Sequence, residues 1–138
     1  MQKIAASPKL VLSVISENFT IHKLSPDAST PEEILKSNYY SISKTENELS
    51  LVCSEVIEVQ SLQSSKGWKC IKVAGPLDFN LTGILAGISD ILAKRNISIF
   101  AISTFDINYI LVRQRTCLQP EQTSGKLVIN SNKLILNI

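Results

Sequence analysis

The clearest pattern in the chain is an apolar stripe at helical spacing in its second half. Large apolar residues recur at intervals of three and four positions, and small residues lie between them. This spacing places the large side chains on one face of an α-helix. Asp78 or Asn80 can cap the first turn of that helix. The residues of the stripe are Leu81, Ile84, Leu85, Ile88, Ile91 and Leu92.

Strands are predicted on both sides of this helix. The run Trp68–Val73 precedes it and ends at the breaker Ala74-Gly75-Pro76. Two runs follow it, Ile97–Ser103 and Tyr109–Arg113, joined by a turn at residues 105–108. Both are almost wholly apolar, which is typical of strands covered on at least one face. The order strand, helix, strand, strand begins a split βαβ unit of the ferredoxin-like kind.

The first half repeats this order more faintly. Two strand-like runs, Leu10–Ile15 and Phe19–Leu24, are separated by a polar turn at residues 16–18. A brief helix is then predicted from Thr30-Pro31-Glu32-Glu33, because Thr can cap, Pro suits the first helical position and glutamates complement the positive end of a helix. Two further strands complete the pattern, at Tyr39–Lys44 and Glu48–Ser54.

We therefore predict an α+β fold of two tandem ferredoxin-like modules of the βαββαβ type, with antiparallel sheets and helices on one face. Residues 61–67 are the one plausible linker, so the modules are expected to cover residues 1–62 and 63–138. The tail, residues 114–138, is atypical because it is polar and interrupted by Pro120 where a second helix is expected. Its end resembles a hairpin of Lys126–Asn130 and Lys133–Asn137.

Composition narrows the class of protein. A chain of 138 residues with 44% hydrophobic content can bury a core without disulfides or metals. No run approaches the roughly 18 apolar residues that span a bilayer, and Met1–Pro8 lacks the features of a signal peptide. We expect a soluble, cytoplasmic protein with no membrane partner. The net charge of +2, without a basic cluster larger than Lys94-Arg95, argues against nucleic-acid binding.

The residues that usually carry catalysis or metals are sparse. Cys53, Cys70 and Cys117 are widely spaced in apolar stretches, so we expect buried, reduced thiols. His22 is the only histidine, and no nucleophile or acid can be tied to it by spacing. The glycines fit neither a dinucleotide-binding nor a phosphate-binding loop. We expect no catalysis, no metal and no cofactor.

One segment offers binding chemistry. Gly75–Asn80 leads from a strand into the helix, whose first amide N–H groups lack internal partners and can hold a ligand carboxylate. Gly83, lacking a side chain, would let that carboxylate approach, and a nearby acid or amide could take a ligand amino group. Two alternatives stay open: Gly83 serves only close packing, and Asp78 serves only as a cap.

The same residues resemble a known family. GPLDFNLTGIL at residues 75–85, NISIFAISTF at 96–105 and YILV at 109–112 resemble ACT domains of the CASTOR type. This group includes bacterial tandem-ACT proteins and the animal CASTOR arginine sensors. The likeness spans about residues 8–113, and the chain is similar to one half of an arginine sensor, which holds two such tandem pairs. In the first half it rests on FTIHKL (19–24), YSISKT (40–45) and ELSLVC (48–53).

The resemblance implies side-by-side ACT modules, dimerisation through the second module and a small ligand held between modules, as arginine is in the sensors. Carried over residue by residue, three positions at the helix start would face the backbone end of the ligand. Two positions at the hairpin would line the pocket, and two on the preceding strand would come from the facing module. These are, in that order, Asp78, Gly83 and Ile84; Thr104 and Phe105; Ser98 and Ile99.

The chain departs from the family pattern at Asn108, where the pattern has an acid just before the aromatic residue. An amide can hydrogen-bond an ammonium group but cannot neutralise it, so affinity for a cationic ligand is expected to fall. We predict a non-catalytic regulatory homodimer that binds a small molecule of the amino-acid type, with Asn108 in its site. The alternative is a structural or protein-interaction scaffold that kept the ACT fold and lost its ligand.

Overall fold

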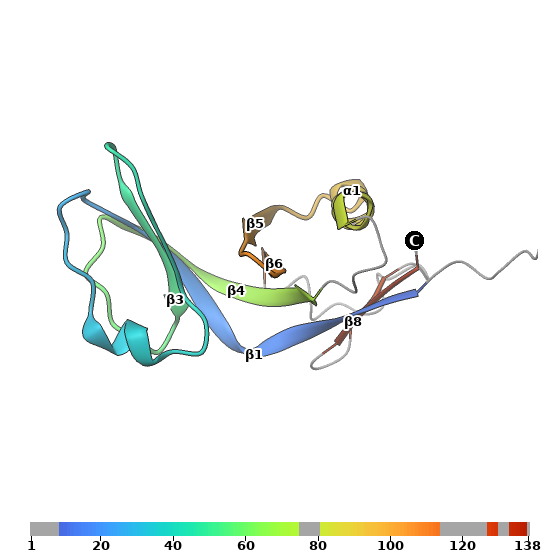
Figure 1. Ribbon diagram of the computed structural model, residues 1–138, viewed down its shortest axis with the longest axis horizontal. Helices are drawn as coiled ribbons and strands as arrows, with labels where there is room; N and C mark the ends of the chain where they lie inside the picture. Colours follow the sequence, from blue (N-terminus) through green and yellow to red (C-terminus); the bar gives the residue numbers. More distant parts are fainter. Residues whose placement is uncertain (1–8, 75–80, 114–126, 130–132, 138) are drawn as a thin grey trace, which may run out of the picture. The chain divides into compact units, whose positions relative to one another are not determined.

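A computed structural model of the chain describes residues 9–74, 81–113, 127–129 and 133–137. The pairs β1–β3, β1–β8, β2–β3, β5–β6 and β7–β8 are antiparallel, which confirms the α+β class and the antiparallel pairing expected from the sequence (Figure 1). The elements are β1 (Lys9–Leu24), the 3-10 helix η1 (Glu32–Lys36), β2 (Ser41–Lys44), β3 (Leu49–Ser54), β4 (Gln63–Ala74), α1 (Leu81–Lys94), β5 (Ile99–Ser103), β6 (Ile107–Arg113), β7 (Leu127–Ile129) and β8 (Lys133–Asn137).

The strands follow the order β2-β3-β1-β4-β6-β5, and β8 pairs with both β1 and β7. The chain divides into two compact units. We call Glu17–Trp68 the small unit, and Met1–Ser16 together with Lys69–Ile138 the helix-bearing unit. β1 and β4, with 16 and 12 residues, contribute to both.

β1 continues through the polar residues 16–18, so the predicted turn there is wrong. Along its length β1 pairs first with β8 and then with β3. The backbone carbonyl groups of the polar stretch keep partners: Lys69 Nζ donates to Ser16 O at 2.8 Å, and Glu55 N donates to Asn18 O at 3.0 Å. The polar residues therefore mark a change of strand partner and not a reversal of the chain.

The predicted linker, residues 61–67, is also largely a strand, because β4 already begins at Gln63. Gly67 adopts a positive φ of 81°, which glycine tolerates without steric cost. Its N–H donates to Glu55 Oε2 at 2.7 Å. The polar character of this run reflects exposed strand positions, since Ser64 and Lys66 are exposed.

The brief helix of the first half is a 3-10 helix. Its N-cap is Pro31, which makes no side-chain capping bond, so the predicted capping by Thr30 is wrong. It ends at Lys36, and the C-cap residue Ser37 donates its N–H to Ile34 O at 2.9 Å. Ile34 anchors it in the small-unit cluster, a group of buried residues consisting of Leu24, Ile34, Leu49, Leu51 and Cys53.

Two complete βαββαβ modules are not seen in the described residues, where α1 is the single α-helix. In a full ferredoxin-like unit the strand that closes the sheet follows a second helix. Here β4 lies between β6 and β1, so the place of that closing strand is taken by β1, from the beginning of the chain. The predicted terminal hairpin is confirmed by the β7–β8 pair, and β8 pairs with Lys9–Ser13 of β1. The stretch around Pro120 lies outside the described residues.

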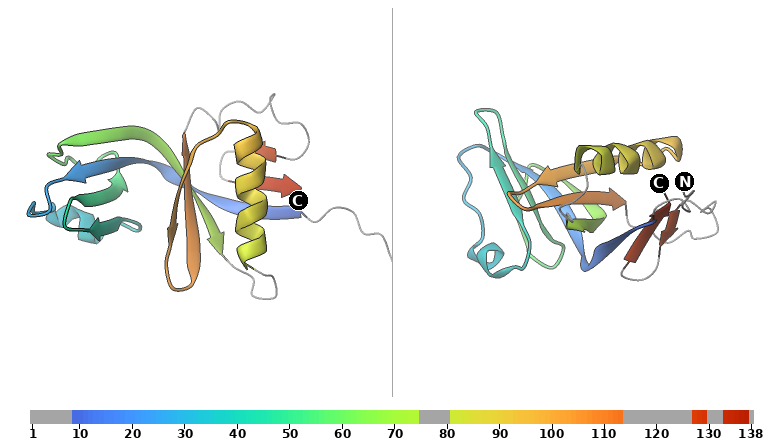
Figure 2. Two further views of the ribbon diagram at one scale, coloured as in Figure 1. Left: turned by 90° about the horizontal axis from the view of Figure 1, so that it is seen from above. Right: turned by 45° about the vertical axis from the view of Figure 1, so that its right-hand side comes forward.

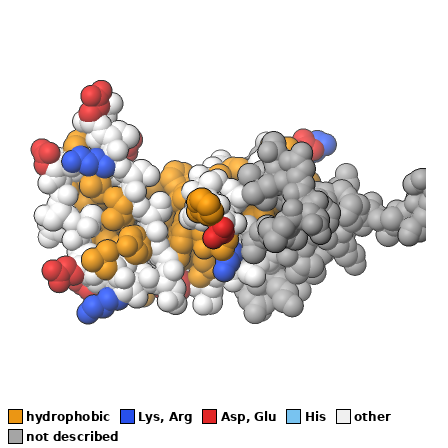
Figure 3. Space-filling view, in the orientation of Figure 1, with side chains coloured by type: hydrophobic (Ala, Val, Ile, Leu, Met, Phe, Trp, Pro, Cys, Tyr) orange, Lys and Arg blue, Asp and Glu red, His pale blue; other side chains and the backbone are white. Residues whose placement is uncertain are grey.

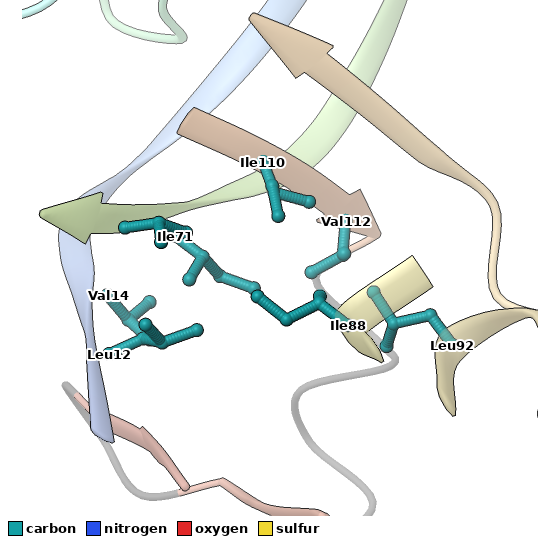
Figure 4. Packing of buried hydrophobic residues seen from close by; sticks show 8 residues of the cluster. Leu12, Val14, Ile71, Ile88, Leu92, Ile110 and Val112 are labelled. Carbon is teal, nitrogen blue, oxygen red and sulfur yellow. The ribbon is translucent and has the colours of Figure 1, made fainter. Parts of the chain in front are cut away.

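The core of the helix-bearing unit is one face of α1 packed on the sheet (Figure 2). Side chains of α1 meet side chains of β1, β4 and β6 (Figure 4). This confirms the predicted apolar stripe where side chains are described. The members of this helix–sheet cluster are Leu12, Val14, Ile71, Val73, Ile88, Leu92, Ile110 and Val112, none more than 7% exposed.

Ile88 is completely buried in the helix–sheet cluster, with 0% of its surface exposed. We expect Ile88→Ala to lower the free energy of unfolding by about 2–5 kcal/mol, because it removes buried methylene groups and leaves a cavity. Urea denaturation followed by circular dichroism measures this. Val56→Ala is the control, since Val56 is 85% exposed, and should change stability by less than about 0.5 kcal/mol. Equal effects of the two substitutions would contradict this core.

The two cysteines of the described part are buried free thiols, as predicted. Burial raises the pKa of the Cys53 thiol to about 11 and that of Cys70 to about 12. The thiolate is the reactive form. In a Cys117→Ser variant at about pH 8, we expect no reaction of the folded protein with Ellman's reagent and two thiols per chain after denaturation. Rapid reaction of either thiol in the folded protein would be inconsistent with this burial.

Candidate functional site

The turn between β5 and β6 carries two of the predicted site residues, Thr104 and Phe105. Thr104 closes the turn: its N–H and its Oγ1 both donate to Ile107 O, at 2.8 and 2.9 Å, and Oγ1 accepts from Ile107 N at 3.2 Å. The turn is therefore shorter than the predicted one, because Ile107 already belongs to β6. Phe105 at its tip is 102% exposed. This arrangement holds an aromatic ring in solvent on a hydrogen-bonded turn.

Asn108 lies just inside this hairpin, opposite Ser103. It is only 7% exposed, and its Oδ1 accepts a hydrogen bond from Ser103 Oγ. Ile110 and Val112 belong to the helix–sheet cluster and alternate with Asn108 along β6, so Asn108 faces the side that α1 covers. An amide oxygen can accept two hydrogen bonds and an amide NH2 group can donate two. Asn108 therefore keeps capacity to bind a polar group there.

The beginning of α1 and the β5–β6 turn lie at the same end of the helix-bearing unit (Figure 2). α1 ends at Lys94, and Asn96 takes the left-handed φ of 59° that often terminates helices. The chain then runs back along β5 toward the end where α1 began. Gly83 and Ile84 lie in the first turn of α1, and only their backbone is described. Asp78 lies outside the described residues.

Ser98 and Ile99 lie at the opposite end of β5 from the turn. Ser98 is exposed before the strand, and Ile99 is partly buried against the helix–sheet cluster. A strand of five residues spans roughly 16 Å. Within one chain, these two residues are therefore not brought together with the predicted residues of the turn.

Sequence reasoning missed Ser103, which occupies the acceptor oxygen of Asn108. One partial signal lies in the residues of the turn, although the sequence alone does not give the register of the hairpin. A Thr whose side chain hydrogen-bonds the local backbone is a known turn device. Placing Thr104 and Ile107 as the closing pair sets Ser103 opposite Asn108.

No group of three or more His, Cys, Asp or Glu side chains within the described ranges is arranged to hold a metal ion. No helix in these ranges is long and apolar enough to cross a membrane. On the face drawn in Figure 3, the Lys and Arg side chains of the described residues lie apart from one another and do not form one continuous patch.

Comparison with known proteins gives two family matches and two related curated proteins. Residues 63–118 match the family described as ACT domain, and residues 17–57 match a second family described as an N-terminal domain. The curated relatives are the proteins named cytosolic arginine sensor for mTORC1 subunit 1 from Pongo abelii and Homo sapiens. Each is 30% identical over 130 residues, which are 88% of this chain and 37% of the relative. The chain thus spans little more than a third of these relatives.

The chain is similar to solved structures that include Atu0741 and VC0802. Protein Atu0741 from Agrobacterium tumefaciens is 33% identical, with a TM-score of 0.67, over 75% of this chain and 77% of that one. VC0802 from Vibrio cholerae, described as a protein of unknown function and possible transport protein, is 15% identical, with a TM-score of 0.56, over 78% and 81%. This second likeness concerns the fold alone. From the domain match and the identities of 30% and 33%, the chain is an ACT-domain protein distantly related to the cytosolic arginine sensors.

Proposed function

We propose that this chain is a non-catalytic regulatory module that binds a small molecule of the amino-acid class between the ACT modules of a homodimer. The observation that carries the proposal is the separation of its site residues along β5. The helix start and the turn residues lie at one end, and Ser98 and Ile99 lie at the other. A site built from both groups needs a second copy of the chain.

The outer edge of β5 suits such a second copy. β5 ends the strand order, and within the described residues it pairs only with β6. Three of its apolar residues are only half-buried: Ile99, Phe100 and Ile102. An apolar edge strand with unpaired backbone groups is a template for pairing with another strand. The chain spans 37% of the length of the arginine sensors, so a pair of chains comes closer to that length than one chain does.

The chemistry at the helix start and turn favours a ligand with both a carboxylate and an amino group. The first N–H groups of α1 can hold a carboxylate, because they have no acceptor within the helix. Asn108 retains one acceptor position for an ammonium group, and Phe105 offers an apolar surface to a side chain. The related sensors are named for arginine. In this chain the neutral Asn108 favours an amino acid without a second positive charge.

The proposal includes the division of the chain into an ACT-like module of residues 1–62 and a second module of residues 63–138. A scaffold that has lost its ligand is the second candidate. It is favoured by the hydrogen bond from Ser103, which already occupies one acceptor position of Asn108. Dimerisation is common to both candidates, so ligand binding distinguishes them.

A thermal-shift screen of the twenty amino acids at millimolar concentration tests ligand binding. We expect at least one to raise the melting temperature by about 3 °C or more, because a ligand that binds only the folded state stabilises it. In Asn108→Asp the affinity for that amino acid should rise about fivefold, since a charge-assisted hydrogen bond is about 1 kcal/mol stronger than a neutral one. Asp106→Asn, in the exposed turn, is the control and should leave the affinity unchanged.

If no amino acid stabilises a protein that is shown to be dimeric, the scaffold replaces the sensor. If Asn108→Asp and Asp106→Asn change the affinity alike, Asn108 does not contact the ligand.

The dimer is tested by placing a charge on β5. We expect Ala101→Lys, at an exposed position of this strand, to shift the protein from dimer to monomer in sedimentation velocity, because a lysine on an edge strand opposes strand pairing. Ser43→Lys is the matched control, since Ser43 is exposed on β2, at the other end of the strand order. This variant should remain dimeric. A monomeric unsubstituted protein, or a loss of the dimer in Ser43→Lys alone, would contradict the proposed interface.

A further inference from the structure

His22 lies against an apolar cluster of the small unit. It stands on β1 opposite Leu51 of β3, and strand alternation puts it on the same face as Leu24. Leu51 and Leu24 both belong to the small-unit cluster. Only 6% of the surface of His22 is exposed. The single histidine of the chain is thus an ionisable ring held away from water.

The ring has a partner at one nitrogen only. Nδ1 lies 3.1 Å from Ser61 Oγ, within hydrogen-bond distance. Nε2 is buried and has no hydrogen-bond partner in the described part of the chain. A neutral imidazole has one donor and one acceptor nitrogen, and a protonated imidazole donates at both. Protonation would therefore bury a positive charge and leave an N–H group without an acceptor.

Ser61 belongs to the segment that connects β3 to β4, residues 55–62. Its first residue is held by two hydrogen bonds: the Glu55 N–H donates to Asn18 O at 3.0 Å, and Glu55 Oε2 accepts from Gly67 N at 2.7 Å. At its other end, besides the contact with His22, the Leu62 N–H donates to Lys23 O at 2.8 Å. Two of its apolar side chains, Ile57 and Val59, pack against the small-unit cluster. Its other side chains, apart from Ser61, are exposed, so the second half of the segment depends on the contacts at Ser61 and Leu62.

We propose that His22 acts as a pH-sensitive latch, whose protonation releases the second half of this segment, which contains Ser61 and Leu62, from β1. In the neutral state the ring joins Ser61 to the sheet and seals the edge of the small-unit cluster. In the protonated state the ring gains hydration by turning toward water, which the segment prevents while it is closed. The released half exposes Val59, and with it one side of the cluster. This device acts within the small unit and does not depend on the proposed ligand.

Two effects disfavour the protonated form of His22. Burial, first, and the positive charge of Lys66 on β4, second, lower the pKa of His22 from 6.5. From β3, the same face carries Leu51 and Cys53, and burial raises the pKa of the Cys53 thiol to about 11, so it stays neutral. The connecting segment contributes the hydroxyl of Ser61, and η1 contributes Ile34 to the cluster.

The direction of the pH effect follows from this lowered pKa. In the released state the ring is solvated and has an ordinary pKa of about 6.5, so that state takes up a proton first as the pH falls. The stability of the closed segment is therefore fully present above about pH 6.5 and decreases as the pH falls toward the lower pKa of the closed state. Between about pH 7.5 and 5.5 the population of the released state rises by up to about tenfold, a limit set by the ordinary histidine pKa.

Two measurements on the full chain test this proposal. The single histidine allows its imidazole signals to be followed by NMR without ambiguity, and we expect a midpoint below 6.5. Hydrogen exchange of the Leu62 amide, corrected for the intrinsic effect of pH, should lose protection by up to about tenfold between pH 7.5 and 5.5. In His22→Gln, which keeps a polar side chain that does not titrate, the protection of this amide should not depend on pH.

A pair of lysine variants distinguishes a latch from a purely structural histidine. Lys66→Met removes the charge that disfavours protonation and should raise the NMR midpoint of His22 and reduce the pH response at Leu62. Lys44→Met, at an exposed position of β2, is the control and should change neither. An ordinary midpoint near 6.5, or an unchanged protection of the Leu62 amide in the unsubstituted protein, would overturn the proposal. Both readouts use the natural chain, so the test stands even if His22→Gln fails to fold.

Discussion

The packing of one face of α1 against the sheet is the constraint on which the helix-bearing unit depends. Ile88 and Leu92 can be buried only if β1, β4 and β6 present their apolar faces to the helix. This requirement determines which side chains of β6 face α1, namely those of Ile110 and Val112. It also recruits Leu12 and Val14 from the beginning of the chain, where a ferredoxin-like unit would use a strand from its end. The candidate site is a consequence of the same packing, because Asn108 shares the face of Ile110 and Val112.

The candidate site therefore contains a polar residue, Asn108, at the border of an apolar core. Asn108 is buried and already hydrogen-bonded to Ser103, whereas Phe105 is fully exposed three residues earlier. A ligand that contacts both would lie across the end of the hairpin, close to the end where α1 begins. Ser98 and Ile99 are separated from this end by the length of β5, which is why the proposed site is built from two copies. The proposed preference for an amino acid without a second positive charge rests on the neutral side chain of Asn108.

The sequence predicted those parts of the fold whose periodicity was strong. The apolar stripe beginning at Leu81 located α1, and the apolar runs after it located β5 and β6. Exposed polar residues within strands led to a wrong turn prediction at residues 16–18 and to a linker prediction at residues 61–67. Composition does not reveal which strand pairs with which. Of the predicted site residues, Thr104, Phe105 and Asn108 lie in one hairpin, and their role in binding stays a prediction. The sequence alone could not identify the bond from Ser103, because that requires the register of the hairpin. Nor could it place β1 beside β4, because this pairing depends on contacts between residues far apart in the chain.

The proposed function places a small molecule between two copies of this ACT-domain chain. A crystal structure of the protein, grown with the amino acid that most stabilises it, measures this directly. We predict a dimer with ligand density that contacts the helix start at Gly83 in one copy and Ser98 in the other, with its amino group at Asn108. A dimer whose interface contains no ligand, or a ligand bound wholly within one copy, would contradict the proposed function.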